Sequence, residues 1–269
     1  MSYDSKTGGY LTPPRHLVTK PFTLEDVNEW KIKCTEFPMY DSIELEVAIA
    51  LYSIIRLTGA KNILETGCSR GFSTCFLAAG VSDNNGGKVT TVDTVSCFHL
   101  WEGSNLEKFI NFNQMQSFDL YKNVENEQFD MLFLDSLHTY KNLMEEIMIF
   151  ERKLKIGGIL VLHDTLFYDG LGFAANSLLE NPRYETINLP TPRRHKNNSR
   201  CPGITVSMKI SDDIEKYPFY ISQKYINWDE ETFWEDPSIK NNLCTNKKRD
   251  FHSESILDIL RNKKINNMI

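Results

Sequence analysis

The sequence of 269 residues predicts an α/β fold built on a doubly wound, mainly parallel sheet. Short apolar or β-branched segments alternate along residues 41–210 with segments whose apolar residues recur at helical spacing. Two of the short segments, 131–134 and 159–162, are apolar throughout, which is typical of strands buried on both faces of a sheet. Strands that alternate with helices in this way form sheets covered by helices.

The individual elements are predicted from the period of the apolar residues and from the residues that interrupt it. The first helix is expected to begin after Asp41, a plausible N-cap, with Glu44 three residues later. The pair Gly157-Gly158 is expected to end a helix over 140–155. The other predicted helices are 72–79, 104–113, 170–180 and 253–261, and the predicted strands are 62–66, 88–93, 131–134, 159–162, 184–189 and 203–210.

Composition restricts the class of protein. Hydrophobic residues make up 41% of the chain and charged residues 25%, which excludes a disordered or collagen-like protein. The net charge of −6 provides no overall positive field, so no nucleic-acid partner is expected. The six cysteines are scattered without a CxxC pair, so we expect reduced thiols in a cytoplasmic protein rather than a disulfide framework or a zinc site.

The chain is expected to contain one domain with an extension at each end. Residues 1–40 are polar and rich in proline, and residues 41–210 carry the strand–helix alternation. Residues 211–269 form an aromatic-rich C-terminal appendage, which we expect to cover an acceptor site or to form a homodimer interface. No run approaches the ~20 apolar residues that span a bilayer, and the N-terminus lacks the apolar core of a secretory signal.

A glycine loop with an acid on each side follows the first predicted strand. Gly67 lets the backbone turn close to a ligand, and Gly71 begins a helix whose N-terminus attracts an anion. Two glycines alone are equally typical of an ordinary strand–helix turn. Glu65 before the loop and Asp93 after the second strand favour a ligand site, since an acid in the place of Asp93 can bind both hydroxyls of a ribose. A nicotinamide-binding fold would need G-x-G-x-x-G, which this loop lacks.

The segment Glu65-x-Gly67-x-x-x-Gly71 resembles the first motif of class I S-adenosylmethionine (SAM)-dependent methyltransferases, and the resemblance extends over residues 42–210. It implies a Rossmann-like methyltransferase sheet whose last strand is antiparallel. It also implies that Glu65 anchors the amino group of the methionine moiety, that Gly67 passes close to SAM, and that Ser73 binds the carboxylate. By the same resemblance Asp93 holds the ribose, and Gln116 and Ser117 lie beside the adenine.

A second group of polar residues follows the two strands that are apolar throughout. Asp135 and Asp164 each end a strand, and His138 lies three residues after the first of them. The ends of parallel strands lie close together, so the two carboxylates could share one divalent cation. The alternative is that the carboxylates cap the following segments and that His138 makes an ordinary hydrogen bond at a helix start.

These segments resemble the D-x-x-H-x-Y and H-D-T patterns of sugar O-methyltransferases near macrocin O-methyltransferase, and also of catechol O-methyltransferase. The resemblance implies that Asp135 and Asp164 bind a metal ion and that His138, beside Asp135, is the general base. Several relatives have an acid or an amide beside the second carboxylate, whereas this chain has His163 and Thr165 there. With His163 as a third ligand, the site would suit manganese or iron better than magnesium.

A basic loop joins the last two predicted strands of an otherwise acidic chain. A solvated loop is one explanation. The other is a clamp on an anionic acceptor, such as the diphosphate of a nucleotide-activated sugar. The residues of this clamp would be Arg193, Arg194, Lys196 and Arg200.

The sequence therefore predicts a SAM-dependent O-methyltransferase that acts on a sugar hydroxyl, with a divalent metal ion and a histidine base. Two alternatives are a metal-independent N-methyltransferase acting on a small phosphorylated amine and a non-catalytic subunit that keeps the SAM pocket. The presence of all three residues Asp135, His138 and Asp164 argues against the non-catalytic subunit.

Overall fold

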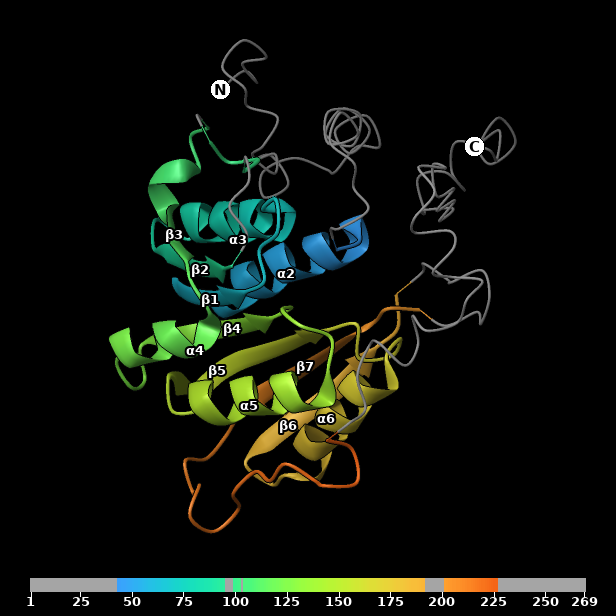
Figure 1. Cartoon of the computed structure of the whole chain (residues 1–269). Coiled ribbons are helices and arrows are strands. Elements are labelled where there is room, and N and C mark those ends of the chain that lie inside the picture. The colour runs from blue at the N-terminus through green and yellow to red at the C-terminus, as the bar shows by residue number, and fades with distance from the viewer. Residues whose placement is uncertain (1–42, 95–98, 103, 192–200, 227–269) are drawn as a thin grey trace, which may run out of the picture.

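The computed structural model describes residues 43–94, 99–102, 104–191 and 201–226, which form one mixed seven-stranded sheet between two layers of helices (Figure 1). The strand order is β3-β2-β1-β4-β5-β7-β6. The strands from β3 to β5 are parallel, and β7 is antiparallel to both of its neighbours, β5 and β6. The strands are β1 (Asn62–Thr66), β2 (Lys88–Asp93), β3 (Ile110–Gln114), β4 (Phe129–Leu134), β5 (Leu154–His163), β6 (Tyr184–Leu189) and β7 (Ile204–Lys209).

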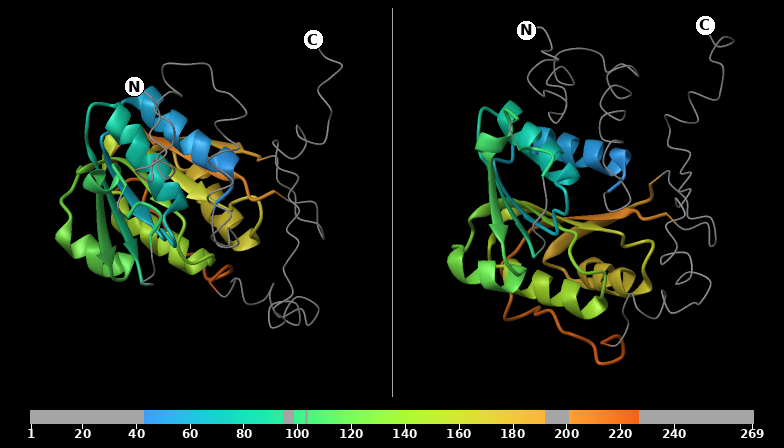
Figure 2. Two further views of the ribbon diagram at one scale, coloured as in Figure 1. Left: turned by 90° about the horizontal axis from the view of Figure 1, so that it is seen from above. Right: turned by 45° about the horizontal axis from the view of Figure 1, so that its top comes forward.

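The helices cover the two faces of the sheet, as Figures 1 and 2 show. Helices α2 (Leu45–Thr58) and α3 (Phe72–Asp83) lie on one face. Helices α4 (Ser117–Leu120), α5 (Tyr140–Phe150) and α6 (Asp169–Glu180) lie on the other face. This is the predicted doubly wound architecture. Among the described helices, none is long and apolar enough to cross a bilayer.

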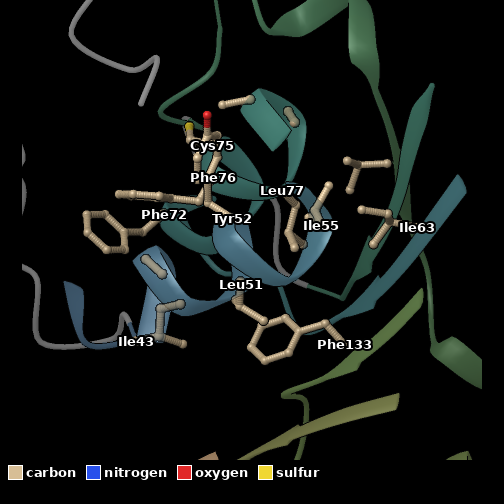
Figure 3. Packing of buried hydrophobic residues seen from close by; sticks show 14 of the residues in the cluster. Ile43, Leu51, Tyr52, Ile55, Ile63, Phe72, Cys75, Phe76, Leu77 and Phe133 are labelled. Carbon is tan, nitrogen blue, oxygen red and sulfur yellow. The ribbon is translucent and has the colours of Figure 1, made fainter. Parts of the chain in front are cut away.

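The core between α2, α3 and the sheet follows from the helical spacing of the apolar residues. Leu51 and Ile55 of α2 pack with Leu77 of α3 and with Ile63 and Phe133 of the sheet (Figure 3). All five side chains are buried. Burial of each such side chain contributes about 1.5–3 kcal/mol, so this layer holds α2 firmly against the strands that carry the site.

Two predicted elements are wrong in part. The helix expected over 104–113 is instead a short 3₁₀ helix, Glu107–Phe109, followed by β3. Residues 110–114 form a strand because they pair in parallel with β2, although their local sequence favours a helix. The helix expected over 140–155 ends at Phe150, and β5 begins at Leu154 because this strand pairs with β4. Gly157 therefore lies within a strand and does not cap a helix.

The first helix begins later than predicted. Its N-cap is Glu44 rather than Asp41, which lies outside the described residues. The other predicted strands, and the helices at 72–79 and 170–180, are confirmed with small changes at their ends. The predicted helix at 253–261 and the expected extension over 1–40 lie outside the described residues.

The first part of the expected C-terminal appendage packs onto the domain. Phe219 is buried beside Tyr184, and the ring of Tyr225 stacks on Phe173 of α6 with ring centroids 4.0 Å apart. The backbone amide of Ser222 donates a hydrogen bond to the Tyr140 hydroxyl at 2.9 Å. The packed domain therefore continues past the boundary expected at residue 210.

Candidate active site

The carboxyl ends of the parallel strands bring the predicted site residues to one edge of the sheet. The backbone amide of Gly67 donates to the carbonyl of Val92 at 2.9 Å, and that of Asp135 donates to the carbonyl of Thr66 at 3.0 Å. These bonds continue the strand pairing for one residue beyond β1 and β4. The loops after β1, β2, β4 and β5 therefore lie side by side.

Gly67 and Gly71 are required by close packing against neighbouring parts of the same edge. Both residues have positive φ angles, 78° and 86°. A Cβ atom on Gly67 would lie 2.1 Å from the carbonyl oxygen of Asp135, and one on Gly71 would lie 1.9 Å from the ring of Trp101. No other residue fits either place. The contacts that resemblance predicts for these glycines with SAM stay predictions.

Glu65 lies at the centre of a buried hydrogen-bond cluster. Its carboxylate accepts hydrogen bonds from the hydroxyls of Ser73 (2.5 Å), Thr74 (2.6 Å) and Thr91 (2.7 Å). The side chain has no exposed surface, and burial raises the pKa of Glu65 to about 7 although the three hydroxyls oppose the shift. The direct contact of Glu65 with a ligand ammonium group stays a prediction. Glu65 ties the start of α3 to β1 and β2.

Asp93 fixes the glycine loop from the next strand. Its carboxylate accepts a hydrogen bond from the backbone amide of Ser69 at 2.8 Å. The carbonyl of Asp93 accepts from the backbone amide of Met115 at 3.0 Å, so Gln116 and Ser117 follow directly beside it. Gln116 is the exposed N-cap of α4, whereas Ser117 is half-buried. The structure thus brings the residues predicted for the ribose and the adenine to one place.

Asp135, His138 and Asp164 form a compact cluster at the same edge. Nε2 of His138 lies 3.4 Å from Oδ1 of Asp135 and 3.4 Å from Oδ2 of Asp164. The His138 ring stacks on Tyr168, with centroids 4.9 Å apart and an interplanar angle of 15°. Asp164 has a φ of 58°, so the chain turns immediately after β5 and places this carboxylate beside that of Asp135. The predicted convergence of the two strand ends is confirmed.

This cluster has the donor atoms of a divalent metal site. One ligand atom from each of Asp135, His138 and Asp164 lies within 4.8 Å of the others, and all three side chains are half-buried. The two carboxylates suit a divalent cation such as magnesium or manganese, and an imidazole ligand, if His138 provides one, favours manganese or iron. The cluster therefore fits the metal that the resemblance implies.

His163 lies beside carboxylates on both sides of its ring. Its Nε2 lies 2.8 Å from Oε2 of Glu44, and its Nδ1 lies 3.1 Å from Oδ1 of Asp135 and 3.5 Å from Oδ2 of Asp164. The ring is buried behind the cluster, with both nitrogens beside carboxylates. Among the described residues the metal-capable cluster contains His138 and not His163, whose role as third ligand stays a prediction.

The charges around His163 favour its protonated form. Burial alone would lower the pKa of His163, but Asp164, Asp135 and Glu44 together raise it well above its ordinary value. The imidazoles of His163 and His138 in turn lower the pKa of Asp135, although burial opposes this. Burial is the larger effect at Asp164, whose pKa is raised.

Comparison with known proteins identifies the fold. Residues 64–165 match the model of a family described as a methyltransferase domain. The O-methyltransferase from Bacillus cereus, solved in complex with SAH, superposes with a TM-score of 0.56 at 20% identity over 72% of this chain and 94% of that one. The fold is that of a class I methyltransferase.

Other solved methyltransferases give the same result. The O-methyltransferase TomG from Streptomyces achromogenes, solved with SAM, superposes with a TM-score of 0.56 at 14% identity over 78% of this chain and 92% of that one. A putative caffeoyl-CoA O-methyltransferase from Staphylococcus aureus gives a TM-score of 0.53 at 18% identity over 72% of this chain and 95% of that one. A search of curated proteins found no significant match. Together with the family match, these structures support the predicted class of enzyme, a SAM-dependent methyltransferase.

A pocket of about 200 Å³ is formed next to α6. It lies between the start of α6, the residue that follows Asp164 and the end of β6. Its polar lining comes from Thr165, Asp169, Asn176 and Asn188. The residues predicted to clamp an anionic acceptor, Arg193, Arg194, Lys196 and Arg200, lie outside the described residues.

Sequence reasoning missed three residues at the edge of the methyltransferase site. Tyr168 supports His138, and Glu44 contacts His163. Trp101 covers Gly71 and stacks on His99, with centroids 4.2 Å apart and an interplanar angle of 8°. A spacing pattern does not signal Trp101 or Tyr168, and the contact of Glu44 with His163 arises only from the packing of α2.

Proposed function

We propose that this protein is a SAM-dependent O-methyltransferase that acts on a sugar hydroxyl, with a divalent metal ion and a histidine base. The observation that carries the proposal is the convergence of Asp135, His138 and Asp164 beside the glycine loop that Asp93 fixes. The fold provides a methyl-donor site and the cluster provides groups able to activate a hydroxyl, at one edge of the sheet.

The methyl donor would bind between the glycine loop and Asp93. The start of α3 presents backbone amides where the carboxylate of the methionine moiety would bind, with Ser73 close by. Asp93 would accept hydrogen bonds from the ribose hydroxyls, and Gln116 with Ser117 would line the adenine site. Glu65 would also position Ser73, because its buried carboxylate accepts a hydrogen bond from the Ser73 hydroxyl.

Asp135 and Asp164 would hold the metal ion, which when bound lowers the pKa of a coordinated hydroxyl and orients it. Of His138 and His163, His138 is the more exposed, with 26% of its side chain accessible to solvent against 6% for His163. Nε2 of His138 cannot bind a metal ion and accept a proton at the same time. We assign it the role of base, because an acceptor hydroxyl can reach the more exposed ring.

The transfer is a displacement at the methyl carbon of a sulfonium group. The oxygen of the acceptor forms the new bond to carbon, the carbon–sulfur bond breaks, and its electron pair stays on sulfur. The hydroxyl proton goes to Nε2 of His138. The stack on Tyr168 and the two carboxylates fix this ring, so that it meets the hydroxyl in one orientation.

A nucleotide-activated sugar is the acceptor that the chemistry favours. The pocket lined by Thr165, Asp169, Asn176 and Asn188 offers amide, hydroxyl and carboxylate groups suited to a sugar ring. The basic residues 193–200 follow β6, whose Asn188 lines this pocket, and would bind the diphosphate. A homodimer and a role of residues 227–269 over this site stay predictions.

Titration with SAM followed by a product assay tests the proposal. The protein is incubated with SAM and a pool of nucleotide sugars, with and without a chelator, and methylated products are identified by mass spectrometry. We expect a methylated nucleotide sugar to form without the chelator, not to form with it, and to form again when Mn²⁺ is added. A methylated phosphorylated amine that forms with the chelator present would favour the N-methyltransferase, and SAM binding without any product would favour a non-catalytic subunit.

A further inference from the structure

We propose that Glu44 is a positioning residue of the active site, which acts through His163 on the two strand-end carboxylates. In this role Glu44 fixes the positions of Asp135 and Asp164. Only the use of these two carboxylates to bind a metal ion rests on the proposed function. It is carried by a continuous chain of short contacts, from Glu44 to His163 and from His163 to both carboxylates.

Glu44 occupies an unusual place for an acidic residue. It is the N-cap of α2, yet its side chain makes no capping hydrogen bond. The side chain is instead only 1% exposed and places Oε2 2.8 Å from Nε2 of His163. A buried carboxylate is costly unless it is paired, and the pairing here is with the last residue of β5.

His163 is held on both sides of its ring. Nε2 contacts Glu44, and Nδ1 lies 3.1 Å from Asp135 and 3.5 Å from Asp164. Phe133 meets the ring edge-on, with centroids 6.4 Å apart. The χ2 torsion of histidine has a broad energy well, so packing alone leaves the ring freedom to rotate. The contact with Glu44 removes that freedom and keeps Nδ1 directed at the two carboxylates.

The chain of contacts also links two parts of the fold. Glu44 precedes α2, which packs on α3 and on the sheet. His163, Asp135 and Asp164 instead lie at the carboxyl ends of β4 and β5. Carboxylate–histidine pairs behind a metal site commonly fix the orientation of the ligands, and loss of such a partner typically weakens metal binding about 10–100-fold. Glu44 would have this effect from a helix far away in the sequence.

The test compares Glu44→Gln with a matched control, Glu46→Gln, which removes the same charge from the first turn of the same helix. Amide hydrogen exchange of peptides covering 135–139 and 164–168 is measured by mass spectrometry, and Mn²⁺ affinity by electron paramagnetic resonance. Glu44→Gln is expected to raise exchange in both peptides about tenfold and to weaken Mn²⁺ binding about 10–100-fold. Glu46→Gln is expected to change neither by more than about twofold.

Exchange at both peptides equal to that of the unaltered protein would overturn the proposal. If the unaltered protein binds no Mn²⁺, the metal in the proposed function is wrong, and the exchange measurement alone decides the role of Glu44. If Glu44→Gln does not fold, Glu44→Asp keeps the negative charge but is one methylene too short to hold the 2.8 Å contact with Nε2 of His163. Raised exchange at 135–139 and 164–168 in that variant supports the role, and unchanged exchange overturns it.

Discussion

Nε2 of His138 lies 3.4 Å from Oδ2 of Asp164, although the two residues follow different strands. If this ring is the base, His138→Ala should lower the rate of methyl transfer at least ~100-fold, the usual contribution of a positioned base. Binding of S-adenosylhomocysteine and of Mn²⁺ should persist, as measured by calorimetry and electron paramagnetic resonance. Tyr168→Phe keeps the stacked ring and should transfer methyl groups at nearly the original rate. Full activity of His138→Ala would exclude the base, and loss of Mn²⁺ binding would make His138 a ligand.

Substitution of either strand-end carboxylate should impair metal binding. Asp164→Asn keeps the shape of the side chain but removes a charged oxygen from the cluster. We expect Mn²⁺ affinity and turnover to fall together, since both depend on the same ligand, with binding of S-adenosylhomocysteine preserved. Asp213→Asn, at an exposed position after β7, is the matched control. Activity of the unaltered protein that survives exhaustive chelation would contradict the role of the metal.

Glu65 should make the stability of the protein depend on pH. Its pKa is about 7 in the folded protein and 4.5 without burial, so the folded state keeps a proton that the unfolded state releases between these values. The free energy of unfolding should therefore fall as pH rises from 4.5 to 7, by about 3 kcal/mol in total from this residue.

Urea denaturation of the unaltered protein and of Glu65→Gln across this pH range measures the effect. The difference in free energy of unfolding between the two should change with pH in the stated direction, in favour of the variant at higher pH. Glu185→Gln, at an exposed place on β6, should follow the unaltered protein throughout. An identical pH dependence for Glu65→Gln would show that Glu65 is ionised in the fold at neutral pH.

Arg183 should be essential for the packing of residues 211–226. Its fully buried guanidinium lies 2.6 Å from Glu151, and its Nε donates to the carbonyl of Tyr217 at 2.9 Å. Arg183→Met leaves a buried carboxylate unpaired and should lower the free energy of unfolding by about 3–5 kcal/mol. Arg152→Met removes the exposed pair with Glu215, which should cost less than ~1 kcal/mol. Urea denaturation measures the free energy of unfolding of both variants. Equal losses in Arg183→Met and Arg152→Met would contradict the role of burial.

Much of the fold could be predicted because buried parallel strands are recognisable as short apolar runs. The strand over 110–114 was missed because only its neighbour β2 decides between strand and helix there. Gly157 was misread for the same reason, since pairing with β4 draws the preceding residues into β5. Local patterns do not contain these tertiary pairings.

The sequence predicts those parts of the candidate site whose positions follow from the ends of parallel strands. Asp135 and Asp164 converge because parallel strands end at one edge. The sequence could not show the sharp turn of the chain after His163, which depends on the positive φ of Asp164. Glu44 reaches the site only through the packing of α2, so its contact with His163 had no local signal.

Binding of S-adenosylhomocysteine, measured by isothermal titration calorimetry, tests the central claim most directly. The account predicts saturable binding at one site per chain, weakened by Asp93→Ala because this carboxylate holds both the ribose and the glycine loop, and unchanged by His138→Ala. Absence of binding at millimolar ligand, with the protein folded, would contradict the assignment as a SAM-dependent methyltransferase.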